Sequence, residues 1–188
     1  VKSIDWAKTP EKYKMGRSMD MTPTLTPWKT TTSWLKTFVS SADHFYPDYT
    51  VTFAICNAVE NGVVTTGTSD WKDYAVKSTI TFSQQESAGL VARAKGHRRY
   101  YGAVLTEDCA VIYKQQNEKR IEIARAPFDY LIDHTYELEF AVKADNLIMK
   151  IDGNIVVKGK DSEYDNGQAG FVVDTGAILG DGFEICRL

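Results

Sequence analysis

Cysteine and histidine are scarce in this sequence, and their scarcity excludes several classes of protein. The three cysteines, Cys56, Cys109 and Cys186, are odd in number, far apart and set in apolar runs. That placement favours buried, reduced thiols over a disulfide framework or a zinc site. The three histidines stand in separate segments, with neither a Gly-x-Ser-x-Gly elbow nor a His-Glu-x-x-His motif. The sequence therefore lacks the recognisable parts of a nucleophilic or zinc-dependent hydrolase.

A surplus of positive charge is also missing. Twenty-two basic residues against 25 acidic residues give a net charge of −3, so there is no broad electrostatic footprint for nucleic acid or an anionic membrane. No run approaches the ~18 to 20 apolar residues of a membrane span, and the first residues do not look like a signal peptide. Neither nucleic acid nor a membrane is expected as a partner.

Alternation of apolar and polar residues is the dominant pattern. It is clearest in 74–82, where Tyr74, Val76, Ile80 and Phe82 occupy even positions, and it recurs in 49–55 and 136–142. Such period-two patterns predict half-buried β-strands. Further short β-rich runs lie at 89–94, 100–105, 110–114, 121–125, 147–151, 155–158, 169–173 and 183–188.

Turn-forming residues separate many of these runs. The segments 61–62 (Asn-Gly), 152–154 (Asp-Gly-Asn) and 166–167 (Asn-Gly) supply residues that adopt positive φ, as hairpins and tight corners require. About ten strands at a spacing of roughly 8 to 12 residues predict an all-β fold, a two-sheet antiparallel jelly-roll β-sandwich. Hydrophobic residues make up 43% of the chain, enough to fill its core without a cofactor. Only Pro127 to Ile132 has the pattern of a helical turn.

One domain is predicted. Residues 45–188 form the jelly-roll sandwich, since a single sandwich commonly has this length. Residues 1–44, with Pro10, Pro23, Pro27 and a Thr-rich segment, are the least regular. We interpret them as an irregular, extended lead-in that can donate an edge strand around 34–39.

Two acidic segments are candidates for chemistry. Glu137 and Glu139 project from the same strand face, as the paired acids of a glycosidase would. A solvated strand face is favoured, because the third acid of jelly-roll glucanases is replaced by Ala141. The segment 161–167 spaces oxygen ligands like a calcium loop, but its glycine is out of register and Val172 stands where a closing Glu belongs, which favours a polar hairpin turn. No cofactor is expected, with a structural calcium ion as the open alternative.

Cationic and aromatic residues gather at two places. The run 97–101, His-Arg-Arg-Tyr-Tyr, can stack on and hydrogen-bond to sugars or single-stranded nucleic acid, and the acidic balance argues against the second. The alternative is a strand start with solvated arginines. Arg93 lies inside the apolar run 89–94, so it is expected either to floor a ligand groove or to form an internal ion pair with Glu122, Glu137 or Glu139.

Several segments, in their order along the chain, resemble the concanavalin A/laminin G-like jelly rolls. They are 71–76 (Trp-Lys-Asp-Tyr-Ala-Val), 89–93 (Gly-Leu-Val-Ala-Arg), 99–101 (Arg-Tyr-Tyr), 136–140 (Tyr-Glu-Leu-Glu-Phe), 151–153 (Ile-Asp-Gly) and 170–171 (Gly-Phe). The resemblance spans residues 45 to 188. The sequence is similar to family-66 carbohydrate-binding modules, to related domains of keto-disaccharide hydrolase type, and to a C-terminal domain of some bacterial ADP-ribosylglycohydrolase-like proteins.

This resemblance implies a non-catalytic carbohydrate-binding module, an accessory domain of a larger glycan- or glycoside-acting protein. The concave sheet and its rim would bind the sugar, and the candidate ligand-binding residues are Trp71, Asp73, Arg93, Arg99 and Tyr101, with Glu122 as a polar neighbour. Two alternatives stay open: a structural domain that docks on the catalytic domain of an ADP-ribosylglycohydrolase-like parent, and a glycoside hydrolase in its own right. The module would be extracellular if it targets polysaccharide and cytoplasmic if it serves an intracellular hydrolase.

Overall fold

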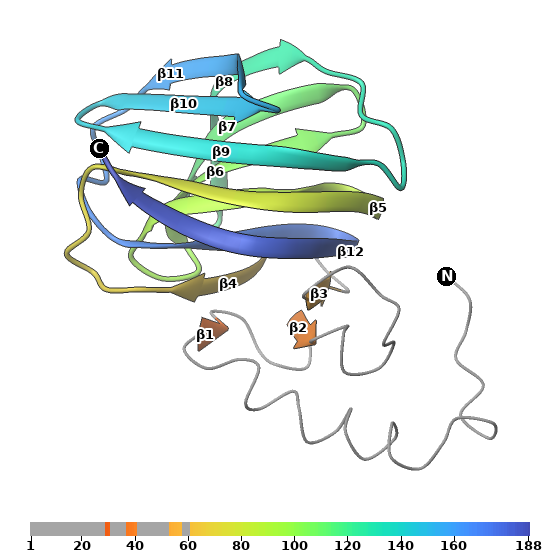
Figure 1. Cartoon of the computed structure of the whole chain (residues 1–188). Helices are drawn as coiled ribbons and strands as arrows, with labels where there is room; N and C mark the ends of the chain where they lie inside the picture. Colours follow the sequence, from red (N-terminus) through yellow and green to blue (C-terminus); the bar gives the residue numbers. More distant parts are fainter. Residues whose placement is uncertain (1–28, 31–36, 41–52, 58–60) are drawn as a thin grey trace.

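The computed structural model describes residues 29–30, 37–40, 53–57 and 61–188, and this part of the chain is built from strands (Figure 1). The strands are β1 (Lys29–Thr30), β2 (Thr37–Ser40), β3 (Phe53–Asn57), β4 (Gly62–Thr66), β5 (Tyr74–Ala94), β6 (Arg99–Thr106), β7 (Cys109–Gln116), β8 (Lys119–Pro127), β9 (Thr135–Lys143), β10 (Asn146–Ile151), β11 (Asn154–Lys160) and β12 (Gln168–Arg187). These described residues contain no helix, and so none long and apolar enough to cross a membrane.

Two long strands, β5 and β12, connect the two sheets of the sandwich. They pair antiparallel from Tyr74 opposite Arg187 to Ala94 opposite Gln168. The first half of β5 also pairs with β9 and its second half with β6, while β12 pairs first with β4 and then with β3. Each long strand therefore passes from one sheet into the other.

The pairing defines two antiparallel sheets. Sheet I has the order β1-β4-β12-β5-β6-β7-β8, and sheet II has the order β2-β3-β12-β5-β9-β10-β11. Figure 1 shows β9, β10 and β11 in front of β6, β7 and β8. The predicted all-β, two-sheet antiparallel jelly-roll sandwich is confirmed.

The bends of β5 and β12 define one end of the molecule, here called the far end. At this bend Thr175 and Gly176 have φ values of 30° and 136°, and the register shifts beyond Gly176. The opposite, near end brings the two tips of β5 together, since Arg93 N donates to Tyr74 Oη over 2.6 Å. The sequence predicted separate strands at 74–82 and 89–94. They form one strand of 21 residues because the polar segment between them has no glycine or proline to stop it.

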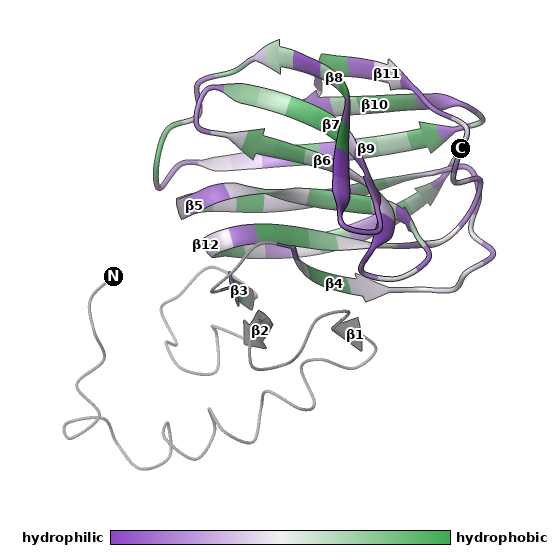
Figure 2. Ribbon diagram, turned by 180° about the vertical axis from the view of Figure 1, so that it is seen from behind, coloured by the Kyte–Doolittle hydropathy of each residue, from purple (hydrophilic) through white to green (hydrophobic). Residues whose placement is uncertain are grey.

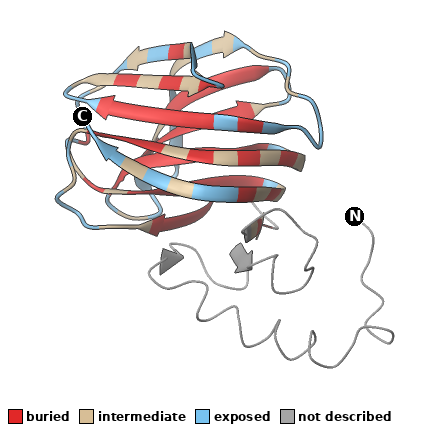
Figure 3. Ribbon diagram, in the orientation of Figure 1, coloured by how far each residue is buried: buried red, intermediate tan, exposed pale blue. Residues whose placement is uncertain are grey.

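The main core lies between the sheets and follows the predicted alternation. In β9, Tyr136, Leu138, Phe140 and Val142 are buried while Glu137 is exposed. Figure 2 shows apolar and polar residues alternating along the strands, and Figure 3 shows the buried positions running through the middle of both sheets. Burial of these aromatic and branched side chains is the main stabilising contribution to the fold.

A second apolar cluster lies on the face of sheet I that points away from sheet II. It consists of side chains that alternate in register with the core residues of β4, β5, β6, β7 and β12: Val63, Val91, Ala94, Tyr100, Val104, Cys109, Val111, Tyr113 and Val172. All of them are buried. Gly102 leaves room for this packing, since a Cβ there would stand 2.4 Å from the Tyr113 ring.

Strong curling of sheet I closes it over this cluster. Arg120 on β8 donates to Asp174 on β12 through Nη1 at 2.5 Å and Nη2 at 3.1 Å, and to Asn61 Oδ1 at 2.8 Å. In the sheet order β8 and β12 are separated by β5, β6 and β7, so only a coiled sheet can bring these corners together. The guanidinium also covers the Tyr113 ring, 4.3 Å from its centroid.

Asp174 is the acceptor at the centre of this contact. Besides Arg120, its carboxylate accepts from Ser87 Oγ at 2.5 Å and from the Asn61 amide at 2.7 Å, and the residue is 3% exposed. Burial raises the pKa of this carboxyl, but the hydrogen bonds and charge of Arg120, with those of Ser87 and Asn61, outweigh burial and hold the pKa below its ordinary value. The folded state therefore stabilises the ionised form.

Two local predictions are wrong. Residues 128–132 are irregular instead of helical, because their backbone amides bond elsewhere: Phe128 N donates to Asp108 O at 2.9 Å and Leu131 N to Tyr136 Oη at 3.0 Å. Among the cysteines, which are all reduced, Cys109 is buried as expected, but Cys56 is half-buried and Cys186 is exposed on β12.

The structure tests only part of what was predicted for the N-terminal lead-in. Within residues 29–57, β2 pairs with β3, so an edge strand does lie near the expected position 34–39. Residues 34–36, most of the remaining lead-in and the first part of the predicted strand 49–55 lie outside the described residues. The boundary between a lead-in of 1–44 and a domain of 45–188 stays a prediction.

Asp174→Asn is expected to lower the free energy of unfolding by about 2 kcal/mol at pH 7, because it removes the charge that Arg120 faces in a buried contact. The low pKa of Asp174 gives stability that is present above the unfolded pKa, near ~4, and is lost as the pH falls through the folded pKa. The difference between wild type and variant should therefore shrink toward pH 3. Urea unfolding at pH 7 and pH 3 measures both.

Glu118→Gln is the matched control, because it breaks the exposed ion pair with Arg98 and should cost less than about 0.5 kcal/mol. Equal losses for the two variants at pH 7, or a constant loss for Asp174→Asn down to pH 3, would contradict the role given to Asp174.

Candidate functional site

Three connecting segments meet at the near end around Arg93. They are the segment before β5 (67–73), the β9–β10 turn (144–145) and the β11–β12 connection (161–167). Arg93 has a φ of 51°, in the left-handed region that non-glycine residues rarely adopt. This turns its side chain away from the sheet face that simple alternation predicts, and toward these segments. The residue is 1% exposed.

The Arg93 guanidinium is held from four directions. Nε donates to Lys72 O at 3.1 Å, and Nη1 donates to Ala144 O at 2.8 Å and Tyr164 O at 3.0 Å. Nη2 donates to Asp73 Oδ1 at 3.1 Å. A buried charge is costly unless it is paired and hydrogen-bonded, and these contacts meet that requirement. The prediction that Arg93 forms an internal ion pair with Glu122, Glu137 or Glu139 is wrong. Its partner is Asp73, which lies in the loop before β5.

Asp73 presents one free oxygen. Its Oδ1 accepts from Arg93 and from the Ala144 amide at 2.9 Å, whereas Oδ2 forms no hydrogen bond within the described residues. The Asp73 side chain is 44% exposed. The carboxylate is therefore fixed through one oxygen and open to a ligand through the other.

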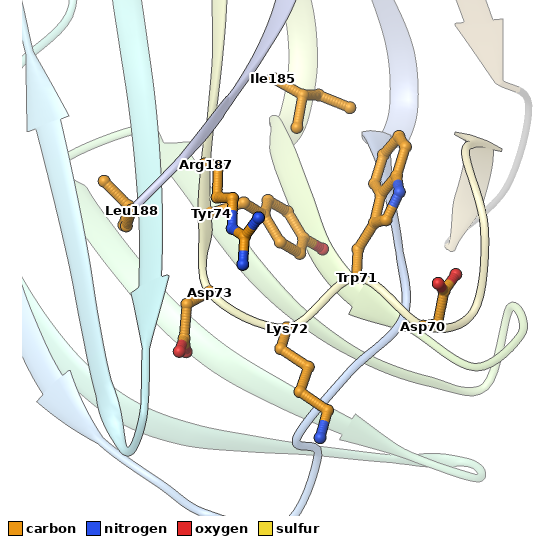
Figure 4. Close-up of a pocket in the computed structure, with 8 residues that line it drawn as sticks. All are labelled: Asp70, Trp71, Lys72, Asp73, Tyr74, Ile185, Arg187 and Leu188. Carbon is orange, nitrogen blue, oxygen red and sulfur yellow. The ribbon is translucent and has the colours of Figure 1, made fainter.

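Two hollows adjoin Asp73. The Arg93 hollow has a volume of about 300 Å³ and is lined by Lys72, Asp73, Arg93, Ala144, Ser162, Tyr164 and Asp165. The Trp71 hollow has a volume of about 650 Å³ and is lined by Asp70, Trp71, Lys72, Asp73, Tyr74, Ile185, Arg187 and Leu188 (Figure 4). Their linings share Lys72 and Asp73, so both hollows border the Asp73 carboxylate.

The Trp71 indole is anchored at the edge of the larger hollow. Trp71 O accepts from the Gly167 amide at 2.9 Å, and the ring meets Tyr74 edge to face with centroids 5.9 Å apart. Gly67, with φ at +98°, lies against the indole, because a Cβ there would stand 2.3 Å from a ring carbon. The half-buried ring is a fixed apolar surface beside polar groups, which is the composition of a small-molecule site.

Tyr74 joins this wall to Arg93. Its hydroxyl accepts from Arg93 N at 2.6 Å and lies 3.1 Å from the carbonyl oxygens of Gly167 and Gln168. Burial raises the pKa of Tyr74, so the hydroxyl keeps its proton and can donate to these carbonyls. Tyr74 thus fixes the backbone of Arg93 and of the β11–β12 connection at Gly167.

The remaining predicted site residues, Tyr101, Arg99 and Glu122, do not line either hollow. Tyr101 is fully buried, donates to Asp161 Oδ1 at 2.6 Å and accepts from the Tyr164 amide at 2.9 Å. It therefore does not line a hollow itself but fixes the backbone of Tyr164, which lines the Arg93 hollow. Arg99 is exposed at the start of β6 and lines neither hollow. Glu122 is exposed on β8, pairs with Arg125 at 2.8 Å, and also lines neither hollow.

Sequence reasoning missed part of the lining. Tyr164 and Asp165 belong to the segment considered as a calcium loop, so their sequence pattern suggested metal binding and not a saccharide site. No sequence pattern identified Ile185 and Arg187 as site residues, because only the pairing of β12 with β5 brings them beside Tyr74. The proposed sugar-binding concave face is occupied in its centre by the apolar cluster of sheet I. Glu122 lies on β8, opposite Tyr113 in the β7–β8 pairing, and so away from the near-end loops.

The loop considered for calcium has its first carboxylate engaged. Asp161 accepts from Lys114 Nζ at 2.6 Å, from Tyr101 and from the Glu163 amide. Burial raises the pKa of Asp161, but these hydrogen bonds, with Lys114 first, hold it below the ordinary value. Across the described ranges no three His, Cys, Asp or Glu side chains gather as a metal ion would require.

The paired acids of β9 differ in environment. Glu139 is 9% exposed and bound by Lys77 at 3.0 Å and Lys150 at 2.7 Å, while Glu137 is exposed. Burial raises the pKa of Glu139, but the two lysines outweigh it and hold the pKa low. A glycosidase general acid needs a raised pKa, so Glu139 does not suit that role.

A further cavity of about 620 Å³ lies at the far end. Its lining consists of Ser83, Gln85, Glu86, Thr106, Glu107, Asp108, Tyr130, Ile132 and Thr175. It carries carboxylates with no cation in the lining and contains none of the predicted site residues. The near end, where charges of both signs meet an indole, is therefore the stronger candidate.

Solved structures with a similar fold include a carbohydrate-binding module and a galectin. The chain superposes on a family-66 carbohydrate-binding module from Bacillus subtilis with a TM-score of 0.73 and 17% identity, over 85% of this chain and 95% of the other. It also matches galectin LEC-6 from Caenorhabditis elegans, with a TM-score of 0.53 and 10% identity, over 83% and 99% of the two chains.

A third match is to part of an enzyme. Xylan β-1,4-xylosidase from Bacillus halodurans C-125 superposes with a TM-score of 0.54 and 12% identity, over 72% of this chain and 32% of that one. No protein-family model and no curated protein matches the sequence. At these identities the likeness establishes the fold alone, which is a jelly-roll β-sandwich.

Proposed function

We propose that this chain is a non-catalytic carbohydrate-binding module whose ligand binds at the near end, in the two hollows that share Asp73. The observation that carries the proposal is the Asp73 carboxylate, held by Arg93 and Ala144 through one oxygen and free at the other, between a fixed indole and a polar hollow. This arrangement suits a molecule that offers several hydroxyl groups beside an apolar ring face.

The chemistry of sugar recognition matches these groups. A carboxylate accepts from a sugar hydroxyl in a charge-assisted hydrogen bond, and the C–H face of a pyranose or furanose packs on an indole. Arg93 and Tyr74 fix the surrounding backbone, so little ordering accompanies binding. Affinity would still be modest, because both hollows are open to solvent on one side.

Two proteins of similar fold, a carbohydrate-binding module and a galectin, support this proposal. The partial match to a xylosidase supports a position as an accessory domain within a larger glycan-acting protein. An ADP-ribosylglycohydrolase-like parent has no such support. The parent protein and its catalytic domain remain part of the proposal.

One observation favours the docking alternative. Leu131 and Ile132 are adjacent, 66% and 65% exposed, and flanked by the exposed carboxylates Asp129 and Asp133 at the far end. An apolar pair with a polar rim is the kind of surface on which a second domain can dock. Docking there would leave the near end free, so the two functions are compatible.

Trp71→Ala and Asp73→Asn are each expected to weaken saccharide binding at least about tenfold, because one removes the apolar platform and the other the free charged acceptor. A glycan array identifies the ligand, isothermal titration calorimetry gives the affinities, and near-ultraviolet circular dichroism verifies folding. Glu122→Gln is the control and should bind like wild type. No binding to any glycan, or an equal loss in all three variants, would rule out the near-end site.

Arg93→Lys keeps the charge but cannot reach all four acceptors. It is expected to lower the free energy of unfolding by about 3 kcal/mol, because at least two buried acceptors lose their donor. Chemical denaturation measures the change. A loss under about 0.5 kcal/mol would show that the guanidinium does not hold the near end together.

Joint replacement of Glu137 and Glu139 by Gln tests the hydrolase alternative. If wild type releases no reducing sugar from the glycans it binds, and the double variant binds them equally, the module is non-catalytic. Hydrolysis by wild type that disappears in the double variant would instead establish an enzyme.

A further inference from the structure

We infer that the Trp71 hollow is a subsite for a sugar unit that carries a carboxylate, with Arg187 as the residue that pairs with it. The inference deepens the proposed function and rests on it, since it names the chemical class of saccharide. Three features of the hollow lead to it: the position of Arg187, the local charge balance and the apolar wall.

Arg187 is held in place but its charge is unpaired. Its backbone lies opposite Tyr74 in the β5–β12 pairing, and the next residue is fixed by Leu188 N donating to Asp73 O at 3.1 Å. The Arg187 side chain is exposed and forms no ion pair with any described residue. Figure 4 shows its guanidinium in the middle of the lining residues, with Trp71 on one side and Asp73 on the other.

The charged residues that line the hollow are unevenly distributed around it. Lys72 is exposed and forms no ion pair within the described residues, but its charge interacts with that of Asp165. Asp73 already faces Arg93, and Asp70 accepts from the Thr68 hydroxyl. Figure 4 also draws Asp70 on the far side of Trp71 from Arg187. The lining thus holds two carboxylates and two cations, and an anionic group is favoured only at the part of the hollow beside the Arg187 guanidinium.

The apolar wall indicates that the anion is attached to a ring. Trp71, Ile185 and Leu188 line the same hollow as Arg187. A uronic acid unit has a C–H face for the indole and a carboxylate at its edge for the guanidinium, which binds carboxylates in a bidentate geometry. A simple inorganic anion would use only the second contact. A volume of about 650 Å³ also accommodates a sugar unit together with its carboxylate.

The adjoining Arg93 hollow offers different chemistry. Its lining adds Asp165 and Ser162 to the shared Asp73, so oxygen acceptors for neutral hydroxyl donors are more numerous there. The two hollows would therefore take different units of one saccharide: the acidic unit beside Trp71 and Arg187, and a neutral unit beside Asp165 and Ser162.

The test uses a glycan array of matched pairs, each an oligomer of glucuronic, galacturonic, mannuronic or guluronic acid beside its methyl ester. At low ionic strength at least one acid should bind about fivefold or more tightly than its ester, because a partly exposed ion pair contributes on this scale. The ratio should fall as salt is raised. In Arg187→Gln it should fall below about twofold.

The controls separate this inference from the proposed function. Lys158→Gln removes the same charge from the exposed surface of β11 and should keep the wild-type ratio. Equal binding of every acid and its ester, a similar loss of preference in Lys158→Gln, or displacement of the acid by sodium acetate at the same concentration overturns the inference. Binding of neutral glycans in that case leaves the proposed function standing, whereas the absence of all saccharide binding removes both.

Discussion

The burial of one arginine at the near end is the constraint on which the rest of the site depends. Arg93 is 1% exposed, and its charge is tolerated because three backbone carbonyls and Asp73 surround it. Those acceptors come from the segments before β5, after β9 and after β11. One guanidinium thus fixes three loops that the sheets alone would leave independent, and it orients the carboxylate that we assign to ligand binding.

Curling of sheet I determines where a ligand can bind. Its outer face is filled by buried residues such as Tyr100, Tyr113 and Val172, and the Arg120–Asp174 contact closes the sheet over them. The centre of that face is therefore a second core. The open hollows lie at the strand ends, where loops supply polar groups at the edge of the rigid sandwich.

The sequence predicted what local patterning controls and missed what topology controls. Alternation in 74–82 and 136–142 identified the strands, because burial of one face imposes a period of two. Trp71, Asp73 and Arg93 were recognised by residue type, and they do lie together. The partner of Arg93 could not be predicted, because its positive φ redirects the side chain and leaves no trace in the pattern. Arg187 is more than a hundred positions from Trp71, and only the β5–β12 pairing unites them. Glu122 is separated because it lies on β8, at the edge of sheet I.

Chemical-shift mapping of the ¹⁵N-labelled protein with its saccharide ligand tests the central claim most directly. The account predicts that the largest changes fall on the Trp71 indole N–H and on the amides of Asp73, Ala144 and Leu188, with residues 106–108 and 122–125 unchanged. Changes concentrated on those last two segments, with the Trp71 indole unaffected, would contradict it.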